Sequence, residues 1–291
     1  MSGREAAILS ERAVIEVAGP QARDFLQGLV TVDLDRLEQG SACNGALLTP
    51  QGKILFEFML FDGGPERILL DVRAEAAGEL AGRLAFYKLR AKLTIAEAPA
   101  LAVIALWGEG ATPEGIAAPD PRLAALGDRL IAPREGLEEA LERAGISLVT
   151  AEAYHARRIA HGIPEFIADY PPGDVFPHEA DLDQLHGVDF DKGCFVGQEV
   201  VSRMQHRGTA RKRFIAVGID GPPPAPGAAV TAGSGTIGTM GSSIDGRGLA
   251  LLRLDRVGDA QAQDQPIRSE DAVLTPHAPA WARFPIPGAS A

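Results

Sequence analysis

The chain has 291 residues, of which 46% are hydrophobic and 23% are charged, and its formal net charge is −11. This length exceeds the usual size of one domain, so we expect two or three domains that bury a sizeable core. The negative charge argues against a general binder of nucleic acids or membrane surfaces, because both are polyanionic. The two cysteines, Cys43 and Cys194, lie far apart without CxxC spacing, which argues against a disulfide framework or a structural zinc site.

The N-terminal residues carry no signal for export or membrane insertion. Residues 1–17 contain five charged side chains and no apolar signal-peptide region. No run in the chain approaches the roughly 18 apolar residues that a membrane span needs. We therefore expect a cytoplasmic protein without a membrane partner.

The first half of the chain alternates between strand and helix patterns. Residues 13–17 have the pattern of a strand, and residues 21–30 carry apolar side chains at helical spacing. A Pro-Gln-Gly turn predicts a β-hairpin over residues 46–61. Further strands are expected at residues 68–72, 92–95 and 101–106, helices at residues 74–87, 138–144 and 151–161, and a surface loop at residues 108–121.

The pattern changes after Arg213, where glycine and proline separate short apolar runs. Short strands at this spacing are typical of a small β-barrel domain. The proline-rich residues 276–291 are expected to form a tail or strap. The strand candidates are residues 214–219, 228–230, 235–240 and 249–254.

Residues 191–199 (DKGCFVGQE) are the most informative stretch. Cys194 follows Lys192 by two residues, and glycines stand at positions 193 and 197. A neighbouring ammonium group favours the thiolate, and glycine lets a backbone approach a ligand closely. We therefore interpret Cys194 as a functional thiol with Lys192 as its activating group, against the alternative of a buried core cysteine.

Several polar residues near this stretch and near the N-terminus have two open interpretations. The five cations of residues 203–213, with His206 among them, form either a solvated edge or a site for carboxylates, which arginine binds in a bidentate manner. Gln198 and Glu199 either begin a helix or bind a ligand, and Gln27 and Asp33 either cap and pack their helix or line a site. Cys43 is expected in the core, and His178, His186 and His206 lack the spacing of metal ligands.

Four stretches occur in a fixed order: residues 25–33 (FLQGLVTVD), 48–53 (LTPQGK), 158–164 (RIAHGIP) and 192–199 (KGCFVGQE). Together with Pro226, Gly227 and residues 238–243, they resemble the YgfZ family of folate-binding proteins. That family is related to the T-protein, the aminomethyltransferase of the glycine cleavage system. The resemblance covers residues 8–255, and the lysine–glycine–cysteine element is its most specific part, since T-proteins lack the cysteine.

The resemblance implies an α+β fold of the T-protein type. In this fold, two α+β subdomains and a C-terminal β-barrel form a ring around a channel for tetrahydrofolate. The matching boundaries are an N-terminal folate-binding region over residues 1–208 and a barrel with its tail over residues 209–291. The first region is expected to be divided into residues 1–45 with 150–208, and residues 46–149. A monomer is expected.

The resemblance also implies a tetrahydrofolate-binding accessory protein in iron–sulfur cluster assembly or repair, which supports [4Fe–4S] enzymes such as tRNA methylthiotransferases. Cys194 would be a transient iron ligand or a redox thiol. A cluster takes about four ligands, so any cluster would be shared with an assembly protein or a client enzyme. No stable metal site and no direct contact with nucleic acid are expected. The expected folate contacts are Gln27, Asp33, Tyr154, Lys192, Gln198, Glu199 and Arg203.

The chain departs from the T-protein pattern at several positions. Phe56 and Glu57 stand where T-proteins have paired aspartates, and phenylalanine has no proton to exchange, so no enzymatic transfer is expected. Ala160 replaces a pterin-binding glutamate, and Arg12 replaces a tryptophan of some relatives, whereas Tyr154 keeps an aromatic ring for stacking on a pterin. The alternatives are a folate-dependent one-carbon (aminomethyl) transferase and a module that only scaffolds or senses folate.

Overall fold

The computed structural model describes residues 3–38, 40–208 and 210–287. It divides into two compact units, each built from two separate stretches of chain. The first unit combines Met1–Tyr154 with Leu185–Gln198, and the second combines His155–Gln184 with Glu199–Ala291. The subdomain boundaries expected from the sequence, after residues 45, 149 and 208, stay predictions.

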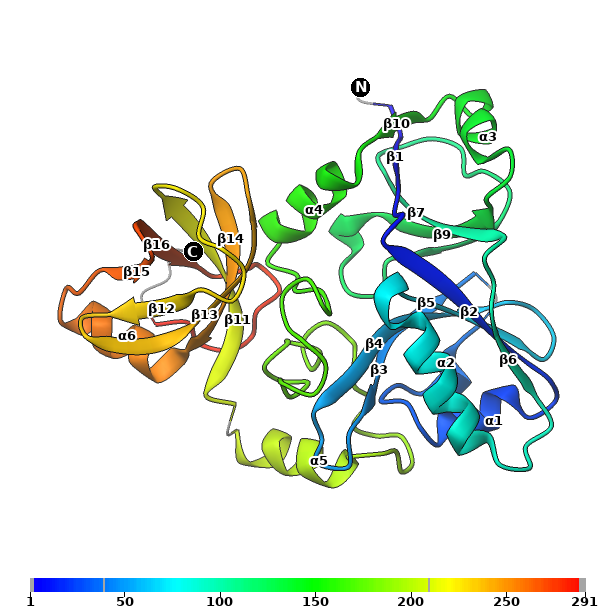
Figure 1. The fold of residues 1–291 in the computed structure, drawn as a ribbon, viewed down its shortest axis with the longest axis horizontal. Helices are drawn as coiled ribbons and strands as arrows, with labels where there is room; N and C mark the ends of the chain where they lie inside the picture. The colour runs from blue at the N-terminus through cyan, green and yellow to red at the C-terminus, as the bar shows by residue number, and fades with distance from the viewer. Residues whose placement is uncertain (1–2, 39, 209, 288–291) are drawn as a thin grey trace. The chain divides into compact units, whose positions relative to one another are not determined.

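Two five-stranded sheets form the first unit (Figure 1). The sheet with the longer strands is antiparallel throughout. One helix packs on it against three strands, and this helix buries apolar residues at helical spacing, among them Ala77, Leu80 and Leu84. The strands run in the order β3 (Ala42–Leu48), β4 (Ile54–Asp62), β5 (Arg67–Arg73), β2 (Arg12–Ala18) and β6 (Thr94–Glu97), and the helix is α2 (Ala74–Lys88).

The other five-stranded sheet of this unit contains one pair of parallel strands. Its order is β10 (Ser147–Val149), β1 (Glu5–Ile8), β7 (Leu101–Trp107), β9 (Asp128–Pro133) and β8 (Ile116–Pro119). The prediction of a surface loop over residues 108–121 is wrong at β8, which pairs with β9. A four-residue strand is too short for alternation of apolar and polar residues to reveal it in the sequence. Short helices complete the unit: α1 (Ala22–Gln27), η1 (Leu34–Arg36), η2 (Ala124–Leu126) and α3 (Leu137–Arg143).

The second unit contains the closed β-barrel that the sequence predicted. Its interior is filled by inward-facing apolar residues such as Ile215, Val230 and Leu252. The last two barrel strands lie in a region where no strand was expected, and a helix follows the fourth expected strand. The strands run in the order β11 (Lys212–Asp220), β14 (Arg247–Arg253), β13 (Gly235–Ile244), β12 (Ala229–Ala232), β15 (Ile267–Ser269) and β16 (Ala272–His277), with α6 (Leu254–Ala262) after β14.

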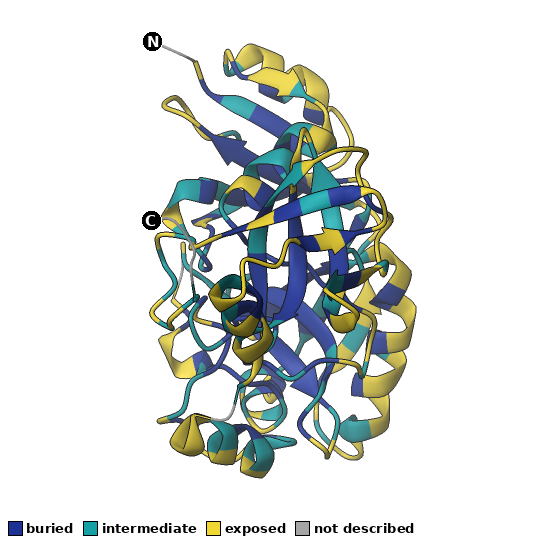
Figure 2. Ribbon diagram, turned by 90° about the vertical axis from the view of Figure 1, so that its left-hand side faces the viewer, coloured by how far each residue is buried: buried dark blue, intermediate teal, exposed yellow. Residues whose placement is uncertain are grey.

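The chain passes between the units at three points, after Tyr154, Gln184 and Gln198. The first lies in α4 (Ala151–Ala160) and the third at the start of α5 (Gln198–Arg207). Figure 2 shows that strands are mostly buried, whereas the helices turn exposed faces outward. No helix in the described part of the chain is long and apolar enough to cross a membrane. The end of the expected tail, residues 288–291, lies outside the described residues.

Candidate functional site

The loop that carries the predicted thiol is fixed to the first unit by Lys192. Its ammonium group donates hydrogen bonds to the backbone carbonyls of Gln27, Val30 and Val32 at 2.7–2.8 Å. Lys192 is 9% exposed, and burial lowers its pKa to about 8 against the opposing charges of nearby carboxylates. An ammonium group has three donors, and here all three are used.

The anchoring by Lys192 corrects its predicted role. With every donor on a backbone carbonyl, Lys192 has no hydrogen bond left for the Cys194 thiol or for a folate carboxylate. The ammonium group lies instead 5.6 Å from the ring centre of Phe195, which is itself buried. Lys192 therefore positions the loop.

A second fixed point follows the thiol. Gly197 has a φ of +79°, and a Cβ atom there would lie 2.6 Å from the Thr49 carbonyl oxygen and 3.0 Å from the Gly52 Cα atom. The loop backbone therefore lies directly against the turn between β3 and β4, and only glycine fits. The sequence interpretation, in which the glycines make room for a ligand, is corrected at this position to a contact between two backbone segments.

Cys194 lies between these fixed points and is exposed. Gly193 beside it has open space within 4 Å of the position where its Cβ would stand. The chain thus holds Phe195 in the core and turns the neighbouring thiol to the outside. Such a thiol is accessible to a ligand or protein that approaches from solution.

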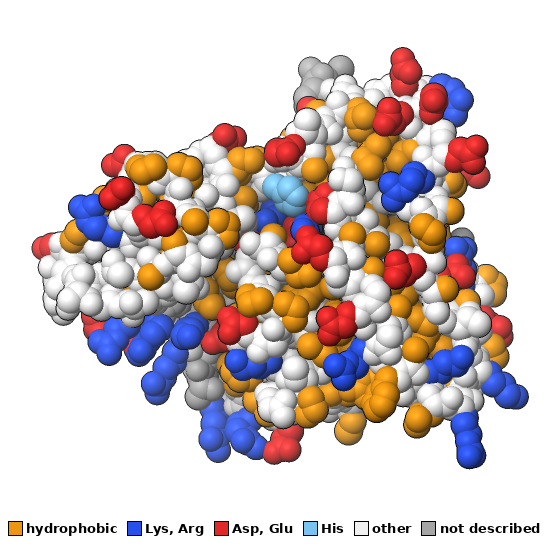
Figure 3. All heavy atoms as spheres, viewed as in Figure 1, with side chains coloured by type: hydrophobic (Ala, Val, Ile, Leu, Met, Phe, Trp, Pro, Cys, Tyr) orange, Lys and Arg blue, Asp and Glu red, His pale blue; other side chains and the backbone are white. Residues whose placement is uncertain are grey.

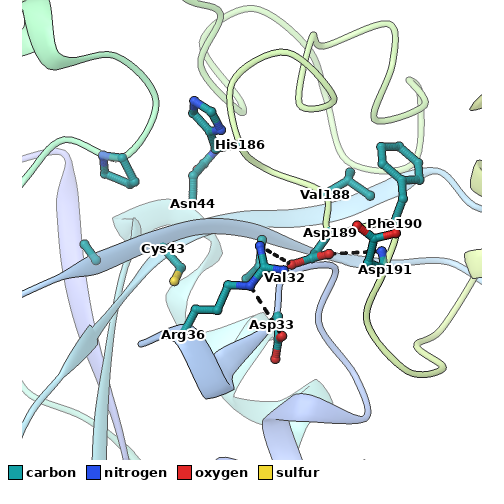
Figure 4. Close-up of a pocket in the computed structure, with 12 residues that line it drawn as sticks. Val32, Asp33, Arg36, Cys43, Asn44, His186, Val188, Asp189, Phe190 and Asp191 are labelled. Carbon is teal, nitrogen blue, oxygen red and sulfur yellow. Dashed lines mark hydrogen bonds and ion pairs between the residues drawn. The ribbon is translucent and has the colours of Figure 1, made fainter. Parts of the chain in front are cut away.

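A pocket of about 510 Å³ lies beside the start of this loop in the first unit (Figure 4). An ion pair crosses it, since Arg36 lies 3.0 Å from Asp189 and 3.7 Å from Asp33. Thr31 connects two of the chain segments that line the pocket, because its hydroxyl donates a hydrogen bond to the Gly187 carbonyl at 2.6 Å. The lining residues are Val32, Asp33, Arg36, Ala42, Cys43, Asn44, Pro121, His186, Val188, Asp189, Phe190 and Asp191.

Asn44 lines this pocket and has an unpaired, buried hydrogen-bond donor. Its side chain is 1% exposed, and its amide nitrogen Nδ2 has no hydrogen-bond partner among the described residues. A buried donor is normally satisfied, so an unpaired one that lines a pocket points to a ligand acceptor. Apolar surfaces from Val188 and Phe190 and the carboxylates opposite suit a flat heterocycle with both acceptor and donor groups.

Two predicted folate contacts, Gln27 and Asp33, lie at this pocket or next to it. The Gln27 amide donates to Asp33 at 2.8 Å and accepts from the Leu34 backbone at 2.8 Å. Asp33 caps η1 and lines the pocket, and the Gln27 hydrogen bond lowers its pKa. Capping and packing are therefore visible roles of both residues, and Asp33 also faces the open space.

Tyr154 does not provide an accessible ring, which corrects the prediction that it stacks on a pterin. It is 1% exposed, and its hydroxyl accepts hydrogen bonds from Arg122 and Arg129, both at 2.6 Å. The Arg129 guanidinium lies 5.0 Å from its ring centre. Buried ion pairs with Asp71 and Asp120 surround these arginines, so this cluster is part of the interior.

The other predicted contacts lie on α5. Gln198 accepts a hydrogen bond of 3.4 Å from the Phe195 backbone at the start of the helix. Glu199 and Arg203 form an ion pair of 2.6 Å one turn apart, and both are exposed. Glu199 thus lies in the first turn of a helix, which was one of its two interpretations from the sequence. Its exposed ion pair with Arg203 contributes little to stability.

Cys43 differs from the core residue that we expected, because it is half-buried and lines the pocket. Burial raises its pKa, so the neutral thiol predominates at neutral pH. No group of three histidine, cysteine or carboxylate side chains within the described ranges is arranged to hold a metal ion. The sequence signals missed Arg36, Asn44 and Asp189, since isolated polar residues in strands and loops carry no distinctive pattern.

Comparison with known proteins fits this architecture. Residues 211–284 match the C-terminal β-barrel domain of CAF17. The aminomethyltransferase T of the glycine cleavage system from Bartonella henselae superposes with a TM-score of 0.77 over 97% of this chain and 87% of its own, at 18% identity. That likeness establishes the expected T-protein fold.

The iron–sulfur cluster assembly factor IBA57 of Mus musculus is 34% identical over 284 residues, which cover 86% of this chain and 77% of that protein. The chain belongs to the IBA57 family. The Homo sapiens member is also 34% identical, over 86% of this chain and 77% of its own length. The IBA57 family shares the folate-binding fold family of YgfZ and the T-protein, so the YgfZ resemblance holds at that broader level. These IBA57 proteins are named as mitochondrial, which overturns the expected cytoplasmic location.

Proposed function

We propose that this protein acts in iron–sulfur cluster assembly as a tetrahydrofolate-binding accessory factor that offers Cys194 to a cluster held by another protein. The exposed thiol on a loop fixed at Lys192 and Gly197 carries the proposal. A loop that is already ordered loses little conformational entropy when its thiol engages a ligand. The name of its IBA57 relatives supports the same role.

The cluster itself would belong largely to the partner. One cysteine supplies one of the roughly four ligands that an iron–sulfur cluster takes. The remaining ligands would come from an assembly protein or from a client [4Fe–4S] enzyme such as a tRNA methylthiotransferase. Cys194 would then complete or release the cluster during transfer.

The thiol is tested by replacing it in the intact protein. Cells that lack this protein should lose activity of [4Fe–4S] enzymes, and the wild-type chain should restore it. Cys194→Ala and Cys194→Ser should both fail to do so at equal protein level, with thermal unfolding close to wild type because the side chain is exposed. Full restoration by either variant would remove the thiol from the mechanism.

Tetrahydrofolate is proposed as the ligand of the pocket that Asn44 and Asp33 line. A pterin presents ring acceptors to the Asn44 amide and donors to a carboxylate, and its flat ring suits the apolar wall at Val188 and Phe190. Its edge therefore complements the groups that the pocket leaves available.

Calorimetric titration with tetrahydrofolate tests this assignment. The wild type should bind, and Asn44→Leu should bind at least tenfold more weakly, which corresponds to about 1.4 kcal/mol. Removing an unpaired buried amide leaves stability nearly unchanged, so the variant should fold normally. Cys194→Ala should bind like the wild type. No heat from the wild type, or equal affinity of Asn44→Leu, would contradict the assignment.

A further inference from the structure

The C-terminal end of α2 exposes two large apolar side chains. Phe86 is 74% exposed and Leu89 is 88% exposed, values that stand out among the described residues of this protein. They lie three residues apart at the point where the helix ends, so both project from the same tip. Leu148 in β10, at 48%, is a third exposed apolar side chain and lies on another element.

This tip, residues 83–92, is held in place by its surroundings. Leu84 and Leu93 on either side are buried in the first unit. The Lys92 backbone N–H donates to the Gln21 side chain at 2.7 Å, and Ala91 donates to the Lys88 carbonyl at 2.9 Å. The apolar side chains are therefore displayed by an ordered turn.

The backbone of Leu89 is strained at this turn. Its φ of +46° and ψ of −107° fall in a region that bulky residues rarely adopt. Glycine would relieve the strain, and it would also remove the exposed leucine. Strain of this kind is found at ligand-contact segments, which points to a function for the outward leucine.

Cations surround the two apolar side chains. Arg83, Lys88, Arg90 and Lys92 lie in the tip, and residues 80–96 contain no acidic residue. None of the four takes part in an ion pair within the described part of the chain, and three are exposed. Figure 3 shows Lys and Arg side chains beside hydrophobic ones at the lower right, where α2 ends in Figure 1.

This local charge is opposite to that of the whole chain. The net charge of −11 disfavours contact with polyanions. Charges beyond about 8 Å are largely screened at physiological salt, however, so a surface that touches only the tip meets mainly its cations.

We propose that the tip is a peripheral contact site for an anionic lipid surface, with Phe86 and Leu89 entering the headgroup region and the four cations facing the phosphates. Two side chains expose at most a few hundred Å², well below the roughly 800 Å² that each partner buries in a stable protein interface. A lipid surface needs no shape complementarity and accepts a small apolar anchor with basic flanks. The site is independent of the thiol and of the folate pocket.

Flotation of the full chain with lipid vesicles tests the site. The wild type should float with vesicles of equal parts phosphatidylcholine and phosphatidylglycerol, and much less with phosphatidylcholine alone. The double variant Phe86→Ser with Leu89→Ser should reduce the bound fraction at least tenfold. Arg83→Gln with Arg90→Gln should reduce it and weaken its dependence on salt.

The matched control is Leu148→Ser, which removes an exposed apolar side chain elsewhere and should bind like the wild type. Phe86→Trp adds a direct readout, because an inserted indole shifts its fluorescence to shorter wavelength when vesicles are added. A wild type that stays unbound, a double variant that floats like the wild type, or equal binding to both vesicle types would overturn the proposal.

Discussion

Lys192 shows how one residue can hold a loop in place without contributing its own charge to the neighbouring thiol. A lysine two positions before a cysteine looks like an activating charge, and that was the expectation from the sequence. In the fold, the side chain turns inward and bridges three carbonyls of the segment after α1. The lysine therefore determines where Cys194 is held, and the thiol remains the group available for chemistry.

Replacing Lys192 by methionine should therefore destabilise the protein. The methionine fills similar space and leaves two buried carbonyls and one partly buried carbonyl without their donor. We expect a loss of about 2–4 kcal/mol, because relief of the buried charge offsets part of the cost. Urea unfolding of the two proteins at pH 7 measures the difference. The control is Lys212→Met, which removes an exposed lysine and should have little effect. A Lys192→Met protein as stable as the control would show that the carbonyls find other partners.

At the level of elements, the thiol loop depends on how closely it packs against the β3–β4 turn. Gly197 permits that approach, whereas Gly193, four residues earlier and next to the thiol, faces open space and has no positive φ. The two glycines look equivalent in the sequence. The structure gives only one of them a steric reason.

Gly197→Ala should therefore destabilise the protein, and Gly193→Ala should not. The added methyl group at position 197 would collide with backbone atoms that cannot rotate away, in a conformation unfavourable for alanine, which predicts a loss of about 2–4 kcal/mol. Differential scanning calorimetry of both variants provides the comparison. Equal melting temperatures would contradict the close packing of the loop on the turn.

Long helices and strands could be predicted from the sequence, whereas the shortest strands could not. The hairpin of β3 and β4, the helix α2 and the barrel strands β11 and β14 have long apolar patterns, so their type was predictable. β8 and β15 are only four and three residues long, so that only their pairing with other strands defines them. The pocket was missed for a related reason, because Asn44 and Asp189 come together only through the fold.

At the scale of the whole molecule, the second unit joins two stretches of chain, and residues 185–198 of the first unit separate them in sequence. Arg213 on β11 makes this connection. Its guanidinium donates to Asp181 at 2.9 Å and to Asp183 at 2.8 Å, and the ring of Phe284 lies 4.2 Å away. Burial raises the pKa of Asp181 well above its ordinary value. At Asp183 burial also acts to raise the pKa, but the hydrogen bonds and charge of Arg213, together with the Gln184 hydrogen bond, lower it overall.

Removing this cation should destabilise the second unit strongly. Arg213→Met removes the cation that the buried Asp181 and Asp183 share, which predicts a loss of about 3–5 kcal/mol at neutral pH. The matched control is Arg253→Met, which breaks an ion pair with Asp255 on the surface and should leave stability nearly unchanged. Thermal unfolding followed by circular dichroism would rank the two variants.

The pH dependence of this deficit distinguishes charge from packing. Because the folded pKa of Asp183 lies below its unfolded value near 3.9, its pairing with Arg213 contributes fully above that pH and fades as the pH falls further. The difference between wild type and Arg213→Met should therefore be largest near neutral pH. It should shrink as the pH falls, first as Asp181, whose pKa burial raises, loses its charge and then below about pH 4 as Asp183 does. A deficit that stays constant down to that pH would mean that Arg213 acts through packing on Phe284, and the charge pairing would play no part in joining the two stretches.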